Sequence, residues 1–151
     1  MYLEHVLIFF STEIHNPAMS FGWGVGDIIA ISALAVKVHT AYQDAPDDYR
    51  HFSGEVRLLE VMINKAKKQF TTLSNEKQME GQLVLESCQT LLEDLNSLVG
   101  KYKSLDSTNN KLDWNRIRFF KEDIAPLRQR LILNMGFLSD FVRRYIPVIP
   151  V

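Results

Sequence analysis

The chain has 151 residues, of which 46% are hydrophobic and 23% charged, so it is long enough to bury the core of one domain. Its formal net charge of −1 argues against a dedicated nucleic-acid-binding protein, because neutralising phosphates requires a basic excess or a concentrated basic face. We therefore expect a single globular domain that binds no nucleic acid.

Cys88 is the only cysteine, which rules out an intrachain disulfide bond and favours a reducing compartment. Residues 6–10 form a short apolar run, but Glu4 and His5 precede it instead of a basic segment, so we expect no signal peptide. No run reaches the about 18 to 20 apolar residues that a membrane-spanning helix needs. The sequence predicts a cytoplasmic protein, at most peripheral at a membrane, in which residues 1–18 are an extension of uncertain order.

Residues 19–30 combine aromatic side chains with regularly spaced glycines and lead directly into an apolar segment. Asp27 is a good N-cap, because its carboxylate can accept hydrogen bonds from the free amides of a first helical turn. Only Ser32 and Lys37 interrupt the apolar side chains of residues 28–38. The pattern predicts a helix over residues 27–43 that is buried on most sides or contacts lipid or a partner. The candidate membrane or partner contacts are Phe21, Trp23, Ile28, Ile29, Ile31 and Leu34.

This segment resembles the N-terminal helical domain of fungal NOD-like receptor and ankyrin-repeat proteins, the HeLo-like group of cell-death and heterokaryon-incompatibility domains. The resemblance covers roughly residues 19–146. It rests on the opening Met-Ser-Phe-Gly-x-x-Val-Gly-Asp at residues 19–27, the apolar first helix, the acidic break at residues 44–48 and the long helices that follow. It implies a module of programmed cell death whose first helix acts on membranes or partner helices once released from a bundle.

Two further segments carry continuous apolar stripes with alternating spacings of four and three residues, which is the pattern of a helix that packs along one face. The second helix places Phe52, Val56, Leu59, Ile63, Ala66, Phe70 and Leu73 on its stripe. The third helix places Val84, Cys88, Leu91, Leu95, Leu98, Tyr102 and Leu105 there. Cys88 is therefore expected to be a buried hydrophobic residue and not a reactive thiol.

The fourth helix shows the same pattern, with Ile117, Phe120, Ile124, Leu127, Leu131, Asn134, Leu138, Phe141 and Tyr145 on one stripe. Pro126 removes one hydrogen-bond donor and is expected to bend this helix near residues 122–126. We interpret Asn134 as a core amide with a hydrogen-bond partner in preference to a ligand contact. The sequence thus predicts an all-α protein, an antiparallel bundle of about four long helices over residues 19–146, followed by a linker or tail at residues 147–151.

No arrangement of residues suggests catalysis or a cofactor. The three glycines of residues 22–26 do not match a dinucleotide-binding turn, because the third is one residue early and no alternation of strands and helices follows. The histidines His5, His15, His39 and His51 lack metal-ligand spacing, and the acidic residues near residue 45 lack the pattern of a calcium loop. We expect no enzyme activity, no cofactor and no metal site.

Two functions remain open. The first is a signalling or cell-death module of the HeLo-like kind, whose first helix meets a membrane or partner helices. The second is a plain helical module for protein–protein interaction or self-association without membrane activity. For the first function, a basic surface that could attract anionic lipid would comprise Arg116, Arg118, Lys121, Arg143 and Arg144.

Overall fold

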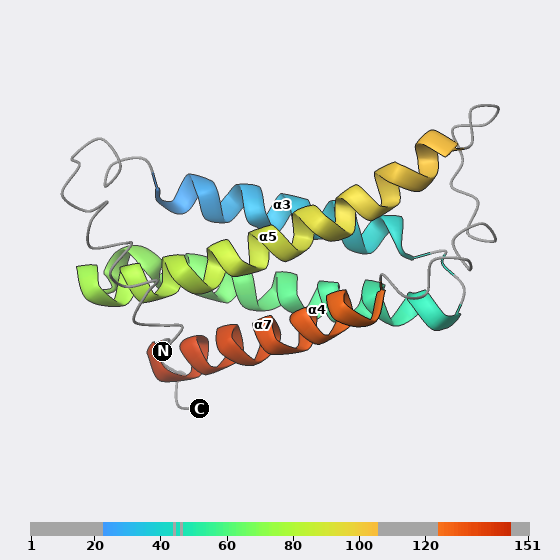
Figure 1. The fold of residues 1–151 in the computed structure, drawn as a ribbon. Coiled ribbons are helices and arrows are strands. Elements are labelled where there is room, and N and C mark those ends of the chain that lie inside the picture. The colour runs from blue at the N-terminus through green and yellow to red at the C-terminus, as the bar shows by residue number, and fades with distance from the viewer. Residues whose placement is uncertain (1–22, 44, 46, 106–123, 146–151) are drawn as a thin grey trace.

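A computed structural model describes residues 23–43, 45, 47–105 and 124–145 of the chain. Four α-helices and one short 3₁₀ helix account for most of these residues (Figure 1): α3 (Val25–Ala41), α4 (Asp47–Gln69), η1 (Phe70–Thr72), α5 (Asn75–Leu105) and α7 (Ile124–Tyr145). The described residues contain no β-strand. The predicted all-α bundle is confirmed.

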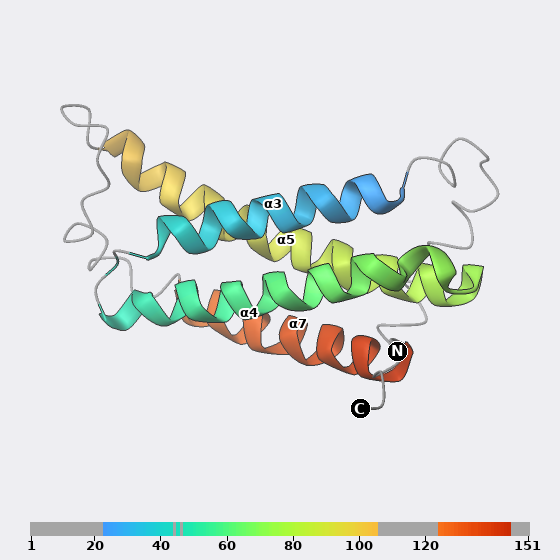
Figure 2. The ribbon, with the colours of Figure 1, turned by 180° about the vertical axis from the view of Figure 1, so that it is seen from behind.

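Each long helix packs on two others. Helix α3 lies on α4 and α5, and α7 lies on the same two helices at the opposite side of the bundle (Figures 1 and 2). The side-chain contacts give the directions: Ser32 meets Asn64 while His39 meets Glu60, so α3 and α4 are antiparallel. Helices α5 and α7 are also antiparallel, because Asp94 meets Arg130 while Glu80 meets Arg144.

The core lies between the four helices and consists of the apolar stripes that the sequence predicts. The predicted α4 stripe is buried from Phe52 to Phe70. In α5, however, Leu85 and Val99 are fully or almost fully buried, whereas the predicted Val84 and Leu98 are only partly buried against the core. The buried face of α5 is wider than the predicted stripe, because this helix packs on both α3 and α7. It comprises Leu85, Cys88, Leu91, Leu92, Leu95 and Val99. The side chains of Tyr102 and Leu105 lie outside the part of the chain whose burial the structure describes.

The start of α3 corrects one prediction. Gly24, in extended conformation with φ of −169°, is the N-cap, and Asp27 is the third residue of the helix. The Asp27 carboxylate accepts a hydrogen bond from the Gly24 amide over 2.7 Å. Asp27 therefore still satisfies a free amide at the positive end of the helix, as an acidic residue of the first turn commonly does. The helix ends at Ala41 with Tyr42 as its C-cap, two residues earlier than predicted.

The positions of Pro126 and Asn134 in α7 follow from their hydrogen-bonding groups. Because this helix begins at Ile124, Pro126 lies in the first turn, where its missing amide costs no hydrogen bond within the helix. Residues 122 and 123 of the predicted bend, together with Ile117 and Phe120, lie outside the described residues. Asn134 is buried, donates to the Arg130 carbonyl over 2.9 Å and accepts from the Ser87 hydroxyl over 2.6 Å, so its interpretation as a partnered core amide is confirmed.

Helices α5 and α7 approach closely where Gly81 meets Phe141. A Cβ atom added to Gly81 would lie 2.7 Å from Cζ of the fully buried Phe141 ring. We predict that Gly81→Ala destabilises the protein by about 1 to 2 kcal/mol, because overpacking outweighs the better helix propensity of alanine. The control is Gly54→Ala in α4, where the added atom meets nothing within 4 Å. Urea unfolding should show this control stabilised by about 0.5 to 1 kcal/mol; equal signs for the two variants would mean that the contact is wrong.

Candidate functional site

Helix α3 contributes one face to the core. Ile28, Ala35 and Val38 have no exposed surface, and Ile31 has 1%. Two of the predicted contact residues, Ile28 and Ile31, are therefore unavailable to any partner while the bundle is closed. Of the others, Trp23 and Leu34 are partly buried and Ile29 is 52% exposed, while Phe21 lies outside the described residues.

Contacts along its whole length hold α3 in place. The Trp23 ring packs edge-on against Phe70, with 5.4 Å between the ring centroids. The Ser32 hydroxyl donates to Oδ1 of Asn64 over 3.1 Å, and Nε2 of His39 lies 3.1 Å from Oε2 of Glu60. At the far end, the buried Tyr42 hydroxyl donates to the Leu95 carbonyl over 3.2 Å. Release of α3 would break contacts with both α4 and α5.

The solvent side of α3 is also apolar, which the sequence indicated. Gly26, Ile29, Ala33, Val36 and Thr40 are all exposed and follow each other with spacings of three, four, three and four residues. This second stripe, here called the outer α3 stripe, contains no charge; Lys37 is the one exposed charged residue of the helix. An uncharged helical stripe of this kind, open to solvent, can pack against another helix.

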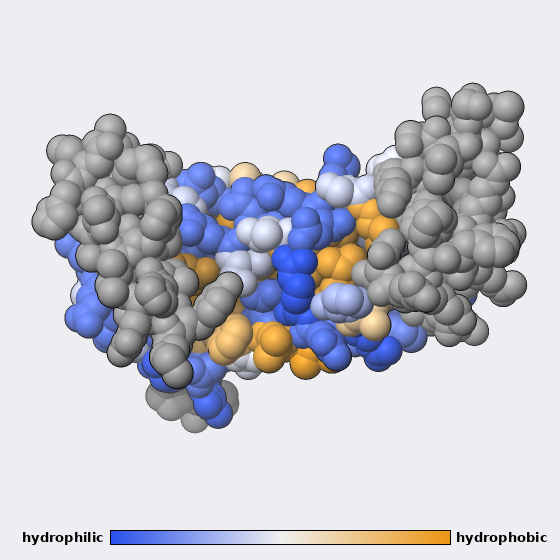
Figure 3. Space-filling model, viewed as in Figure 1, coloured by the Kyte–Doolittle hydropathy of each residue, from blue (hydrophilic) through white to orange (hydrophobic). Residues whose placement is uncertain are grey.

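A second exposed apolar surface, which the sequence analysis did not predict, lies on α7. Ile132, Leu133 and Phe137 are 56%, 58% and 58% exposed, and the exposed Gly136 lies among them. We call these four residues the α7 patch. Figure 3 shows polar surface along the middle of the bundle, over α5, and hydrophobic surface below it, over α7. The signal in the sequence was a second stripe, Arg130, Leu133, Phe137, Asp140 and Arg144, with the same spacing as the core stripe.

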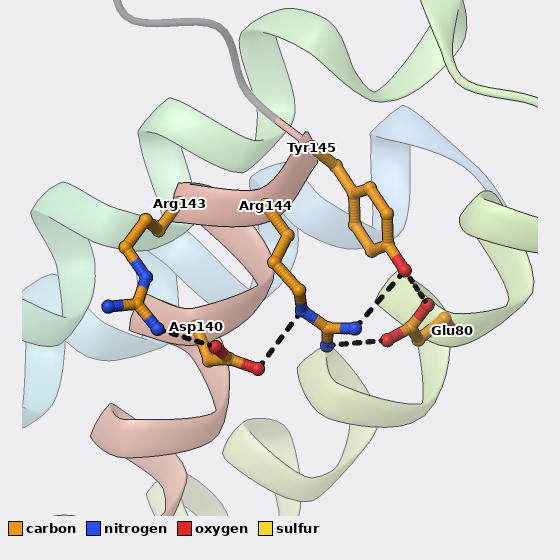
Figure 4. Close-up of polar contacts among 5 residues, drawn as sticks. All are labelled: Glu80, Asp140, Arg143, Arg144 and Tyr145. Carbon is orange, nitrogen blue, oxygen red and sulfur yellow. Dashed lines mark hydrogen bonds and ion pairs between the residues drawn. The ribbon is translucent and has the colours of Figure 1, made fainter.

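A polar cluster joins the C-terminal end of α7 to α5 (Figure 4). Arg144 lies 2.7 Å from Oε1 of Glu80 and 3.0 Å from Oδ2 of Asp140, and Arg143 lies 3.0 Å from Oδ1 of Asp140. The Tyr145 hydroxyl donates to Oε2 of Glu80 over 2.7 Å. Arg143 and Arg144, predicted as part of a basic surface, thus share the Asp140 carboxylate, and Arg144 also pairs with Glu80. The other predicted basic residues, Arg116, Arg118 and Lys121, lie outside the described residues.

Tyr145 makes this cluster sensitive to alkali. Its hydrogen bond to Glu80, together with partial desolvation and the charge of that carboxylate, raises the pKa of Tyr145 above its usual value. A raised pKa means that the folded state favours the protonated phenol, so the contact contributes fully below the usual tyrosine pKa of about 10 and is lost as the pH rises through the higher folded value. At neutral pH the protonated Tyr145 hydroxyl thus donates to Glu80 and links α7 to α5.

The described residues contain neither a metal-binding cluster nor an accessible thiol. Among them, no three His, Cys, Asp or Glu side chains come together in a way that could hold a metal ion. Cys88 is fully buried, and burial raises the pKa of its thiol from 9.0 to about 12. A thiol in this state has almost no thiolate at neutral pH, and the thiolate is the reactive form.

We predict that Cys88 reacts with a thiol reagent such as dithionitrobenzoate only when the protein unfolds. In native buffer the labelling rate should follow global opening and rise steeply with urea. Fast stoichiometric labelling of the native protein at neutral pH would show that the α5 stripe is not closed.

None of the described helices is long and apolar enough to cross a membrane. Comparison with known proteins gives no relative: no protein family, no curated protein and no solved structure matches the chain.

Proposed function

We propose that this chain is a non-enzymatic signalling module that binds partner helices through the outer α3 stripe while its bundle stays closed. The observation that carries the proposal is the division of α3 into two apolar faces. One face forms the core, whereas Ile29, Ala33 and Val36 on the other remain open to solvent. Among the described residues this apolar stripe serves no packing, and a partner is the best explanation for it.

The closed bundle is favoured because releasing α3 is costly. Exposing Ile28, Ile31 and Val38 would alone cost about 5 to 9 kcal/mol, since full burial of such a side chain contributes about 1.5 to 3 kcal/mol. The whole stability of a domain is about 5 to 15 kcal/mol. A mechanism that begins with release of α3 therefore amounts to unfolding most of the domain, whereas the outer α3 stripe needs no such step.

The HeLo-like resemblance supports a role in cell-death signalling, and the all-α bundle has the architecture that this resemblance implies. In that role the module would transmit a signal by recruiting other proteins. The proposal needs neither a cofactor nor a metal.

Site-specific photo-crosslinking in the cells that produce the protein tests this proposal. A photoreactive amino acid at Val36 should yield an adduct of defined mass, and Ile29→Glu in the same chain should abolish it, because it replaces a large apolar residue of the stripe by a charge. The matched control carries the same photoreactive residue at Lys65, which is exposed on α4. Identical adducts from both positions, or an adduct that persists with Ile29→Glu, would contradict the proposal.

Membrane execution is the second candidate, and the apolar character of both faces of α3 favours it. Residues 28–38 extend over about 16 Å, roughly half of a bilayer core, so one copy cannot span and any pore must be oligomeric or interfacial. Vesicles of anionic lipid with trapped dye decide between the two. Membrane execution would be favoured if the wild-type chain releases the dye and the Ile29→Glu variant, shown to be folded, does not. Intact vesicles at all concentrations of the wild-type protein would favour the interaction module.

A further inference from the structure

The α7 patch has the composition of the centre of a small protein–protein interface. Three large apolar side chains, Ile132, Leu133 and Phe137, are each more than half exposed. A Cβ atom added at Gly136 would meet nothing within 4 Å, so another backbone can come close at this point. The patch lies at the opposite side of the bundle from α3, and the inference drawn from it is independent of the outer α3 stripe.

Charges of opposite sign lie at the two ends of the patch. Arg130 precedes it and is 40% exposed in spite of its ion pair with Asp94 over 2.6 Å. Asp140 follows it and is 45% exposed while it pairs with Arg143 and Arg144. Along one flank of α7 the order is thus cation, Leu133, Phe137, anion, with spacings of three, four and three residues.

A second α7 that runs in the opposite direction presents the complementary order, which is anion, Phe137, Leu133, cation. If two copies meet around a twofold axis level with residue 135, Leu133 of each lies against Phe137 of the other, and Arg130 of each lies against Asp140 of the other. A twofold contact requires that the same surface be complementary to itself, and an apolar centre with one cation and one anion at equal distances from it meets this requirement.

We propose that the α7 patch binds a second copy of this chain, with the two α7 helices packed antiparallel. The contact is confined to one helix of about 33 Å per copy, which is smaller than the surface that most stable dimers bury. The dimer is therefore weak and forms where the protein is concentrated, for example when other contacts bring several copies together.

Sedimentation of the purified full chain over about 10 μM to 1 mM measures this association. We expect a concentration-dependent shift from monomer to dimer. Phe137→Glu should weaken the dimer at least about tenfold, because it places a carboxylate at the centre of the contact. The matched control is Leu58→Glu, at a similarly exposed apolar residue of α4, which should leave the association unchanged.

A charge exchange tests the antiparallel geometry. In a homodimer of either single variant, Arg130→Glu or Asp140→Lys, like charges face each other at two equivalent positions. Each variant should therefore associate at least about tenfold more weakly than wild type. An equimolar mixture should recover the dimer, because every contact then joins opposite charges. Circular dichroism must show wild-type helicity for all variants. If a single variant is not folded, the double variant Arg130→Glu/Asp140→Lys is measured instead, and it should form a homodimer as the wild-type chain does. A wild-type chain that stays monomeric at about 1 mM, or a mixture or double variant without recovery, would overturn the proposal.

Discussion

Replacing Ile31 by glutamate should unfold the protein, whereas the same replacement at Ile29 should leave the fold intact. Ile31 is 1% exposed between α4 and α5, so the change removes a buried apolar side chain and puts a carboxylate in its place. Burying an unpaired carboxylate is among the few single changes that cost more than about 4 kcal/mol. Ile29, two residues away on the same helix, is open to solvent and should lose less than about 1 kcal/mol.

Far-ultraviolet circular dichroism during urea titration measures the free energy of unfolding of both variants. The two substitutions are chemically identical and share one helix, so their effects on helix propensity cancel in the comparison. If both unfold the protein, the outer α3 stripe is part of the core or of an obligate contact. If neither does, α3 contributes little to the fold and the argument against its release loses its basis.

The second large effect is expected at Leu95, which has no exposed surface in the middle of α5. Leu95→Ala should lower the free energy of unfolding by about 2 to 5 kcal/mol, because it deletes buried methyl groups and leaves a cavity. The hydrogen bond from Tyr42 to the Leu95 carbonyl remains, since it involves the main chain. Lys67→Ala on α4 is the control and should be close to neutral. Losses of similar size at both positions would mean that the α5 stripe is assigned to the wrong face.

Regular periodicity made most of the fold predictable. In α4 and α7, apolar residues at alternating spacings of four and three gave the buried faces correctly, and Asn134 could be assigned a partner because an amide on such a face must be satisfied. The α5 stripe was placed correctly at Cys88, Leu91 and Leu95 and lost accuracy only toward Val84 and Leu98. The error at Asp27 has a local cause: an acidic residue favours both the N-cap and the first turn, and the sequence cannot tell these positions apart.

The candidate surfaces were harder to predict, because exposure depends on which helices become neighbours. Helix α3 is apolar around most of its circumference, so the sequence did not reveal which residues would face α4 and α5 and which would face solvent. The second α7 stripe is visible in the sequence, but its spacing does not tell whether Leu133 and Phe137 face another helix or solvent. That became clear only with the position of α5, which the Arg130–Asp94 contact fixes. For the same reason the pairing of Arg144 with Glu80, 64 residues away in the chain, had no signal in the local sequence.

Native-state hydrogen exchange of the α3 amides tests most directly whether this helix is a fixed part of the bundle. Amides of the buried face, from Ile31 to Val38, should exchange only through global unfolding, with the same free energy of opening as amides around Leu91 in α5. The urea dependence of exchange should also be the same for both helices, because both open in one cooperative event. Exchange of the α3 amides through a separate opening several kcal/mol below global unfolding would contradict this account and support a helix that leaves the bundle.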